Sequence, residues 1–328
     1  MITNRSWLED SRASWQEGTR EQLVEVGLEP AYVRNLVLRA LDEDLGGRPP
    51  RDAGPPLPGR RNAGHDVTTE ATIEADAEGE AHLLARADGV VSGLPLLPVV
   101  LAEVAAWLDL PVPYADALRR DGDRVRRDDV LAVLRGRTRV LLVAERTALN
   151  LLSRVGGIST HTRAWADALE GSGAQVLDTR KTTPGLRMLE KYAVRCGGGT
   201  NKRMGLYDVA MVKDNHKIAA GSITAAYKLV AERFPEVEIQ VEVTTPDEAI
   251  EAVRAGARFL LCDNMSVPVL EETVRQARAA TAARIELEAT GGLTLEVARD
   301  YARTGIDYLS VGALTHSSPI LDVALDLI

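Results

Sequence analysis

The second half of the chain alternates between short apolar runs and amphipathic stretches. Runs that are apolar throughout predict buried parallel strands, and apolar positions three to four residues apart predict helices that cover them. The pattern therefore favours an α/β barrel, with a doubly wound open sheet as the alternative. Because the segment is short for eight βα units, we expect an incomplete barrel. The predicted strands are 174–180, 208–213, 238–243, 258–264, 284–290 and 307–313, and the predicted helices are 222–234, 245–257, 266–280 and 294–305.

The first half of the chain carries a more mixed pattern. Helical spacing predicts a helix over 30–46, and a second helix is expected over 95–108. The β-like runs 77–93 and 123–142 flank this second helix, which predicts a small α+β domain. Two further segments lack periodicity: residues 1–28 are expected to form a loosely held polar arm, and the proline-rich residues 47–64 a mobile insertion.

Composition and charge narrow the class of protein. The 328 residues are 45% hydrophobic and 27% charged, which is typical of a globular protein, and the net charge of −9 argues against nucleic acid as the main partner. No apolar run is long enough to span a bilayer, and the first residues are too polar for a signal peptide, so we expect a cytoplasmic protein. Cys196 and Cys262 are expected to be buried free thiols.

Polar residues gather at the carboxyl ends of the predicted strands, where barrel enzymes carry their chemistry. Asn215, Thr244 and Asn264 could equally start turns or cap helices. Long charged side chains such as Lys213 and Glu242 need a partner or a ligand inside a barrel mouth. The other strand-end residues are Asp178, Thr179, Arg180, Lys181, Asp214, Asp263, Glu288, Thr290, Gly291, Gly292, Ser310 and Gly312.

Residues 180–213 form a concentrated positive patch in an otherwise acidic chain. They include eight Lys or Arg and two acidic residues, for a net charge of +6. Such a patch suits a small polyanionic substrate. Arg187 and Lys191 are interpreted as a solvated helix face, whereas Gly197–Gly199 predict a loop whose backbone N–H groups can approach anions.

Two carboxylates are expected to face the same barrel mouth. Glu242 and Asp263 follow successive predicted strands, and acids beside so many bases suggest Mg²⁺ held together with substrate phosphates. An ion pair with Lys213 is the competing interpretation. Gly291-Gly292 and residues 310–313 match the phosphate site that barrels often build from their last two βα loops.

Several longer motifs carry a resemblance to a known family. Together they resemble quinolinate phosphoribosyltransferase, the decarboxylating nicotinate-nucleotide pyrophosphorylase of NAD biosynthesis, from about residue 30 to the C-terminus. The chain departs from the family pattern at Lys202, where histidine is usual, and at Thr290, where serine is usual. The motifs are ERTALNLLSRVGGIST (145–160), LDTRKTTPGLRMLEKYAVRCGGGTNKRMGLYD (177–208), VKDNH (212–216), VEV (241–243), CDNM (262–265), LEATGGLT (287–294) and SVGALTHS (310–317).

The resemblance implies a fold and an assembly. It implies an N-terminal α+β sandwich domain over 29–148, an incomplete α/β barrel over 149–315, and a C-terminal segment, 316–328, that returns to the N-terminal domain. It also implies a homodimer, alone or within a larger oligomer, with active sites shared across the interface. The implied enzyme is a pentosyltransferase that converts quinolinate and phosphoribosyl pyrophosphate to nicotinate mononucleotide, pyrophosphate and CO₂, with Mg²⁺.

The same resemblance implies residue roles. Lys181, Glu242 and Asp263 are the implied catalytic residues, and Glu242 and Asp263 also hold Mg²⁺. Arg146 is the arginine that reaches the substrate from the neighbouring subunit. The other implied substrate-binding residues are Arg180, Lys202, Arg203, Lys213, Thr290, Gly291, Gly312 and His316.

Three alternative functions stay open from the sequence. Lys213 could be the Schiff-base nucleophile of an aldolase-like lyase that acts on a phosphorylated sugar. Lys202 leaves room for a phosphoribosyltransferase that uses another pyridine or heterocyclic acid. A polyanion-binding or scaffold protein that has lost the activity is the alternative outside the enzymes.

Overall fold

The computed structural model describes residues 15–46 and 62–328, which form parts of two compact units. Unit 1 extends to Gly157 and also contains the C-terminal segment Ile320–Ile328, and unit 2 comprises Ile158–Pro319. The division falls inside one long helix, α5 (Thr138–Ala168). Residues 1–14 of the expected arm and 47–61 of the expected insertion lie outside the described residues.

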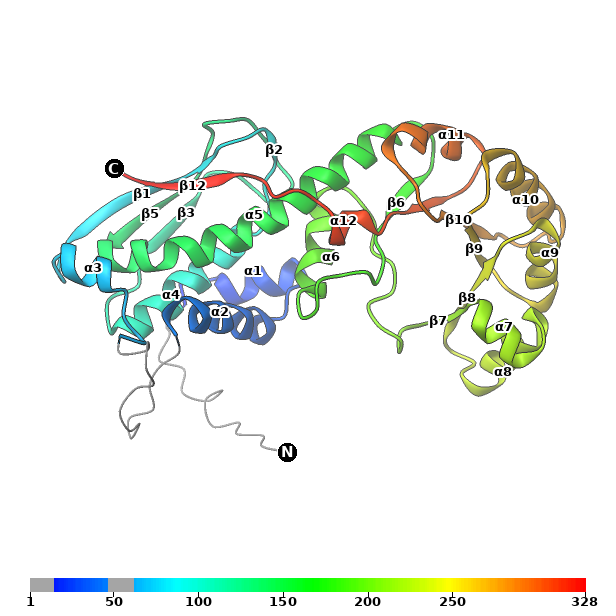
Figure 1. Ribbon diagram of the computed structural model, residues 1–328, viewed down its shortest axis with the longest axis horizontal. Helices are drawn as coiled ribbons and strands as arrows, with labels where there is room; N and C mark the ends of the chain where they lie inside the picture. The colour runs from blue at the N-terminus through cyan, green and yellow to red at the C-terminus, as the bar shows by residue number, and fades with distance from the viewer. Residues whose placement is uncertain (1–14, 47–61) are drawn as a thin grey trace. The chain divides into compact units, whose positions relative to one another are not determined.

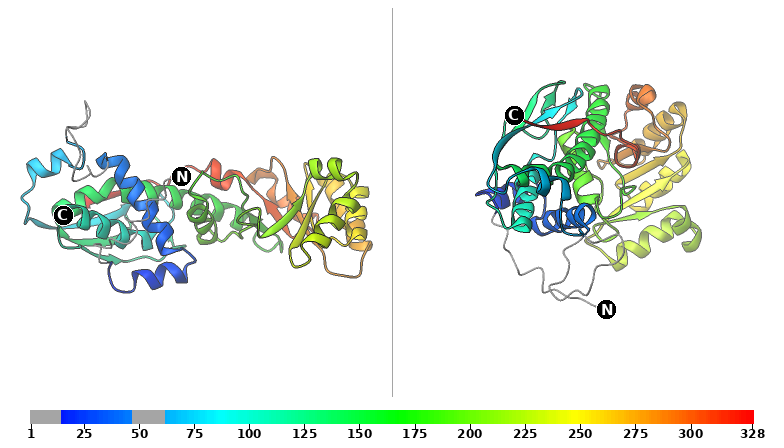
Figure 2. Two further views of the ribbon diagram at one scale, coloured as in Figure 1. Left: turned by 90° about the horizontal axis from the view of Figure 1, so that it is seen from below. Right: turned by 60° about the vertical axis from the view of Figure 1, so that its left-hand side comes forward.

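Unit 1 is built on an antiparallel sheet in which the last strand of the chain is an edge strand. In the described chain this sheet has four strands in the order β12-β1-β5-β3 (Figure 1). Figure 2 shows the C-terminal strand, in red, among the cyan strands of this unit. The strands are β1 (Glu78–Ala85), β3 (Tyr114–Ala117), β5 (Val130–Arg137) and β12 (Val323–Leu327), with a separate pair β2 (Gly89–Val90) and β4 (Arg124–Val125).

Helices cover one side of the unit 1 sheet, and their sequence pattern explains the packing. In α2 (Pro30–Leu45), apolar residues every four positions, from Val33 through Val37 to Leu41, are completely buried. The helix ends at Gly46, whose φ of 77° is the left-handed conformation of a helix C-cap. The predicted helix at 30–46 is confirmed as α2, and the predicted helix at 95–108 is confirmed as a 3₁₀ turn followed by an α-helix. The remaining helices are α1 (Thr19–Glu25), α3 (Val67–Thr72), η2 (Leu94–Leu96) and α4 (Leu97–Leu108).

Two predictions for unit 1 were wrong. From Trp15 onward the expected polar arm is folded, because α1 buries Leu23 and Trp15 donates a hydrogen bond to Glu103 at 3.3 Å. The second strand-like run continued to residue 142, but α5 begins at Thr138. Val140, Leu141 and Ala144 are buried at helical spacing, and this period decides against a strand.

Unit 2 is an α/β barrel that remains open at one place. Its six described strands are all parallel, in the order β6-β11-β10-β9-β8-β7. The first strand, β6, pairs with the last strand, β11, as in a barrel, whereas β6 and β7 do not pair. The predicted strands are confirmed as β6 (Gln175–Leu177), β7 (Val209–Val212), β8 (Glu238–Val243), β9 (Phe259–Asp263), β10 (Glu286–Thr290) and β11 (Tyr308–Ser310).

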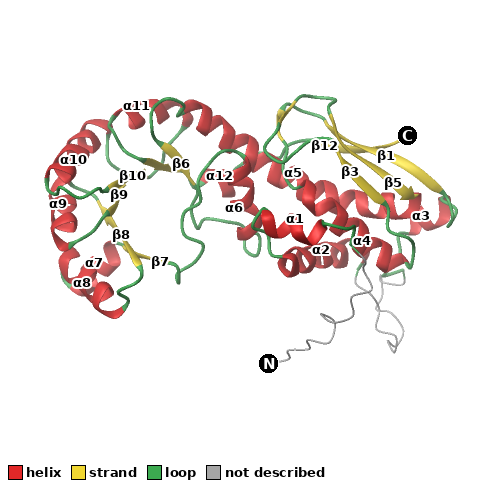
Figure 3. Cartoon of the chain, turned by 180° about the vertical axis from the view of Figure 1, so that it is seen from behind, coloured by secondary structure: helices red, strands yellow, loops and turns green. Residues whose placement is uncertain are grey.

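Helices follow the strands and lie on the outer side of the open barrel (Figures 1 and 3). The four predicted helices are confirmed, the last as a 3₁₀ turn that leads into an α-helix. No helix of the described chain combines the length and hydrophobicity needed to cross a bilayer. The unit 2 helices are α6 (Arg187–Cys196), α7 (Asp214–Ala220), α8 (Ile223–Arg233), α9 (Pro246–Ala255), α10 (Val267–Ala279), η3 (Leu295–Val297), α11 (Ala298–Arg303) and α12 (Ala313–His316).

A small apolar cluster fills the interior of the open barrel. Leu177, Phe259 and Leu261 are buried there, from strands β6 and β9, and Met211 and Tyr308 pack against them. The Phe259 and Tyr308 rings stack with centroids 5.7 Å apart. Because this cluster holds strands from both sides of the opening, it fixes the position of their carboxyl ends.

Candidate active site

A polar cleft lies at the carboxyl ends of the barrel strands, within unit 2. Its volume of about 690 Å³ is typical of a small-molecule site. Every predicted site residue except Arg146 lines it. The lining residues are Thr179, Arg180, Lys181, Lys202, Arg203, Met211, Lys213, Glu242, Leu261, Asp263, Asn264, Glu288, Thr290, Gly291, Gly292, Leu293, Ser310, Val311, Gly312, Ala313 and His316.

Three separate segments bring positive charge to this cleft. Arg180 and Lys181 follow β6, Lys202 and Arg203 lie in the loop after α6, and Lys213 follows β7. Burial, together with the nearby Arg180, lowers the pKa of Arg203 from its usual value. Cations held this close to one another repel, so the cleft favours an anionic ligand that relieves the repulsion.

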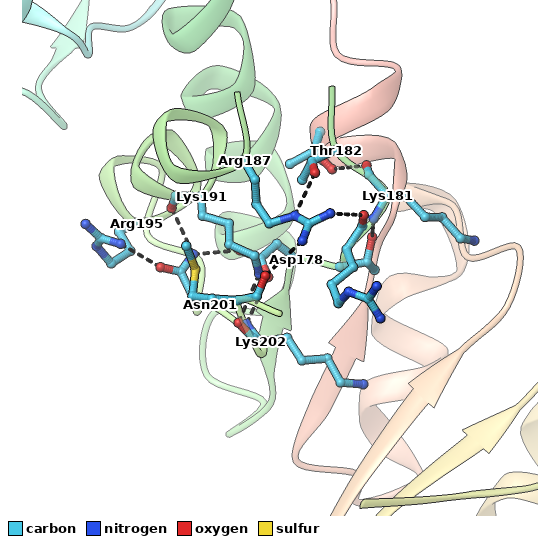
Figure 4. A network of polar contacts seen from close by, with 12 residues as sticks. Asp178, Lys181, Thr182, Arg187, Lys191, Arg195, Asn201 and Lys202 are labelled. Atoms are coloured by element: carbon cyan, nitrogen blue, oxygen red, sulfur yellow. Dashed lines mark hydrogen bonds and ion pairs between the residues drawn. The ribbon is translucent and has the colours of Figure 1, made fainter. Parts of the chain in front are cut away.

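A buried ion pair anchors the loop that carries Lys202 (Figure 4). Asp178, at the end of β6, pairs with Lys191 of α6, and both side chains are completely buried. Asp178 also accepts hydrogen bonds from the Lys202 backbone N–H at 2.8 Å and from Asn201 at 2.6 Å. Burial raises the pKa of Asp178, and the Lys191 ammonium opposes this shift.

The basic face of α6 points into this network. Arg187 and Lys191 were expected on a solvated face, and this was wrong. Arg187 donates to Thr182 Oγ1 at 3.0 Å and to the Met204 carbonyl at 2.9 Å, and Arg195 donates to Asn201 at 2.7 Å (Figure 4). Their spacing of four residues places all three cations on one side of α6. Hydrogen bonds from α6 therefore hold two of the three cation-bearing segments in place, the one with Arg180 and the one with Lys202.

The Gly197–Gly199 segment has a packing role instead of the predicted anion-binding role. Its three N–H groups donate to carbonyls of α6, and it is absent from the described cleft lining. A Cβ at Gly197 would lie 2.5 Å from both the Ser159 carbonyl oxygen and the Thr162 Cβ. Glycine is required because the loop packs directly against α5.

Two carboxylates of the cleft provide a donor set that fits a divalent metal. Glu242 lies 3.1 Å from the Lys213 ammonium through Oε2, and Asp263 accepts from Asn264 through Oδ2 at 2.8 Å. Among the described residues, no three His, Cys, Asp or Glu side chains form a metal-binding group by themselves. Two carboxylates suit Mg²⁺ that completes its coordination with water and ligand phosphates.

The last two βα loops shape the opposite wall of the cleft. Gly291 has a φ of 100°, and a Cβ there would lie 2.3 Å from Asn264 Oδ1. At Gly312, a Cβ would lie 3.0 Å from the Lys181 side chain and 3.1 Å from the His316 ring. Glycine is therefore required at Gly291 by the left-handed backbone and the contact with Asn264, and at Gly312 it leaves room for the Lys181 and His316 side chains.

Glu288 lines the cleft, although the sequence analysis placed it only at a strand end and assigned it no role. Its side chain is completely buried and accepts a hydrogen bond from the Lys202 ammonium at 2.6 Å. The sequence signal was a second glutamate in the same strand, two residues after Glu286 and therefore on the same side of the sheet. The apolar lining residues Met211, Leu261 and Leu293 were missed, since nothing in the sequence separates them from ordinary core, whereas Val311 and Ala313 belong to the predicted segment 310–313.

Arg146 and the two cysteines are absent from the described cleft lining. Arg146 lies on the part of α5 that belongs to unit 1, where its side chain is 64% exposed and lies 3.7 Å from Glu145. Cys262 is buried as expected, and burial raises its thiol pKa to about 12. Cys196 is partly exposed, so the prediction of two buried thiols holds only for Cys262.

Comparison with known proteins assigns this arrangement to a family. Residues 66–155 match the N-terminal domain, and residues 158–326 the C-terminal domain, of quinolinate phosphoribosyl transferase. The chain belongs to the quinolinate phosphoribosyltransferase family.

Relatives within the quinolinate phosphoribosyltransferase family cover nearly the whole chain. The chain is 42% identical to the carboxylating nicotinate-nucleotide pyrophosphorylase of Mycobacterium leprae over 90% of its own length and 96% of that protein. A probable carboxylating nicotinate-nucleotide pyrophosphorylase of Bacillus subtilis is 41% identical, over 80% of this chain and 88% of that protein. The crystal structure of NadC from Streptococcus pyogenes matches with a TM-score of 0.80 and 33% identity, over 92% of this chain and 98% of that one.

Removing the Lys191 charge should destabilise the barrel unit strongly. Lys191→Met leaves the Asp178 carboxylate buried without its counter-ion, which costs about 3–5 kcal/mol of the free energy of unfolding. The matched control, D178N/K191M, removes both charges and should recover part of this loss. Urea unfolding of the two variants and the wild type measures the difference. A loss below about 1 kcal/mol in K191M would show that the pair does not anchor the loop.

Proposed function

We propose that the chain transfers a phosphoribosyl group from phosphoribosyl pyrophosphate to the ring nitrogen of quinolinate and releases CO₂. Nicotinate mononucleotide and pyrophosphate are the other products. The family membership supports this reaction, and so do the names of the relatives from Mycobacterium leprae and Bacillus subtilis.

One structural observation carries the proposal. Five Lys or Arg side chains, three carboxylates and three glycines line a single cleft at the carboxyl ends of the barrel strands. Quinolinate is a dicarboxylate, and phosphoribosyl pyrophosphate carries a monophosphate and a pyrophosphate. A cleft that binds both substrates therefore has to compensate a large negative charge. The clustered Arg and Lys side chains supply the positive charge that this requires.

Binding and orientation are the main contributions of the cations. Arg180, Arg203 and Lys213 are proposed to hold the two carboxylates of quinolinate, with the ring nitrogen directed at C1′ of the ribose. Lys181 is proposed to contact the departing pyrophosphate. Thr290, Gly291, Gly312 and His316 are proposed to hold phosphate groups. Fixing both substrates in one cleft replaces a bimolecular encounter by an oriented reaction, which lowers the entropic part of the barrier.

The carboxylates of Glu242 and Asp263 are proposed to act on the positive charge of the transition state. As the bond from C1′ to pyrophosphate breaks, positive charge builds on the ribose, and Glu242 and Asp263 are proposed to stabilise it and to hold the ribose hydroxyls. The same two residues would hold Mg²⁺, which when bound neutralises charge on the pyrophosphate. The donor set of two carboxylates beside the ligand site fits this ion.

Decarboxylation follows from the new bond. Once the ring nitrogen carries the ribose, the pyridinium accepts the electron pair that the 2-carboxylate leaves behind as CO₂ departs. The carbanion at C2 then takes up a proton, which gives nicotinate mononucleotide. The residues that hold the other carboxylate keep the ring in place during this step.

The lyase alternative is less well supported. A Schiff-base nucleophile needs an amine that is free to attack the substrate, whereas the Lys213 side chain is paired with the Glu242 carboxylate at 3.1 Å. The transferase gives a role to Arg180, Arg203 and the carboxylates of Glu242 and Asp263, which the lyase leaves without one.

A homodimer with shared active sites is the proposed assembly. Arg146 belongs to unit 1, where it is exposed on α5, and the family resemblance assigns its motif to the substrate site. Supply of Arg146 by the neighbouring subunit accounts for both observations. A guanidinium added from outside would complete the set of groups around the quinolinate carboxylates.

The reaction is tested by supplying phosphoribosyl pyrophosphate and Mg²⁺ with quinolinate in one sample and nicotinate in another. Nicotinate mononucleotide and CO₂ are measured. We expect product from quinolinate alone, because the cleft has more cations than a single carboxylate needs. Product from nicotinate alone would assign a sister activity, and product from neither would contradict the proposal.

Shared active sites predict that two inactive variants complement each other. R146A and R203A should each lose at least about a hundredfold in kcat/KM, since each removes an arginine from a substrate carboxylate. In a mixture refolded at equal amounts, half of the dimers are hybrids with one intact site, so about a quarter of the wild-type activity should return. No recovery in hybrids isolated with two affinity tags would contradict the sharing of Arg146.

A further inference from the structure

Several contacts hold the Lys202 side chain in one position. Its ammonium donates to both oxygens of Glu288, at 2.6 and 2.5 Å, and lies 5.8 Å from the centre of the Phe259 ring. Its backbone is fixed as well, because the N–H donates to Asp178 at 2.8 Å and the carbonyl accepts from Lys191 at 2.9 Å. The side chain is only 7% exposed, yet it lines the cleft.

Burial and two neighbouring cations favour the neutral form of Lys202, and Glu288 favours the charged form. Lys213 at the end of β7 and the adjacent Arg203 repel the ammonium, and burial, the largest effect, lowers the pKa of Lys202. Glu288 opposes this shift from β10. Cys262, from β9, faces Glu288, but its thiol pKa of about 12 keeps it uncharged. Glu288 is therefore the charge that keeps Lys202 protonated.

We propose that Glu288 is a positioning residue that holds Lys202 as an ammonium in the cleft wall, where Lys202 binds a carboxylate of the pyridine substrate. This inference rests on the proposed function. An ammonium has three N–H donors, and Glu288 occupies two of them. The third donor is available to the ligand. Without Glu288, the buried amine loses its proton at a lower pH and becomes a poor partner for a carboxylate.

The test is the pH dependence of kcat/KM for quinolinate in E288Q, which keeps the size of the side chain and removes the charge. From about pH 6.5 to about pH 9.5, we expect E288Q to start within about threefold of the wild type and then to fall about tenfold per pH unit above the lowered Lys202 pKa. The loss should appear in KM for quinolinate, whereas KM for phosphoribosyl pyrophosphate should stay within about twofold.

The double variant K202R/E288Q provides the rescue. A guanidinium stays charged throughout this pH range, so the alkaline loss of E288Q should disappear in the double variant. E286Q is the matched control, because Glu286 lies two residues earlier on β10 and outside the cleft lining. Its profile should follow the wild type.

Two results would overturn the inference. A ratio of E288Q to wild type that does not change with pH would assign Glu288 a merely structural role, and an alkaline loss that persists in K202R/E288Q would show that Lys202 is not the titrating group. If E288Q does not fold, E288D replaces it, because the shorter side chain keeps the charge but weakens its contact with Lys202; a ratio of E288D to wild type that does not change with pH then overturns the inference. A wild type without product from quinolinate overturns the proposed function itself, whereas an active wild type with a flat ratio overturns only this inference.

Discussion

The buried ion pair between Asp178 and Lys191 is the constraint on which the rest of the site depends. Taking two charges out of water is costly, and the cost is compensated only when each charge meets its partner and further hydrogen bonds. Asp178 meets this requirement with Lys191, Asn201 and the Lys202 backbone. The same contacts fix the loop after α6 against the end of β6. Stability and placement of the cleft cations therefore share one set of interactions.

This arrangement explains how the chain gathers cations without disrupting its own fold. Arg187 and Lys191 of α6 donate hydrogen bonds to the carbonyls of Arg180 and Lys202, and neither lines the described cleft. They act as supports, and the loops present the cations that line the cleft. Two of those cations also meet carboxylates, with Lys202 on Glu288 and Lys213 on Glu242. The cleft thus contains cations that are paired with a carboxylate and cations that are not part of these pairs. The pairing limits repulsion between the cations before the substrate binds.

The sequence predicted the barrel because its strands are apolar throughout and its helices have regular amphipathic spacing, and both signals are local. The strand-end rule located nearly all the cleft lining, since the carboxyl ends of parallel strands meet at one edge. Other predictions from the sequence were wrong. Lys191 was placed on a solvated face because helical spacing does not show exposure, and Gly197–Gly199 were assigned to anion binding although these glycines serve packing against α5. The start of α5 was predicted as a strand, because Val140 and Leu141 continue a strand-like run. In each case a distant segment decides the environment of the residue.

The central claim is that the cation cluster binds the pyridine carboxylate while the glycine loops bind phosphate, and a crystal structure with bound nicotinate mononucleotide tests it most directly. The account predicts the pyridine carboxylate among Arg180, Arg203 and Lys213, and the phosphate at Gly291 and Gly312. A nucleotide bound in the opposite orientation, with its phosphate among those three cations, would contradict the account, and so would a nucleotide bound outside the cleft.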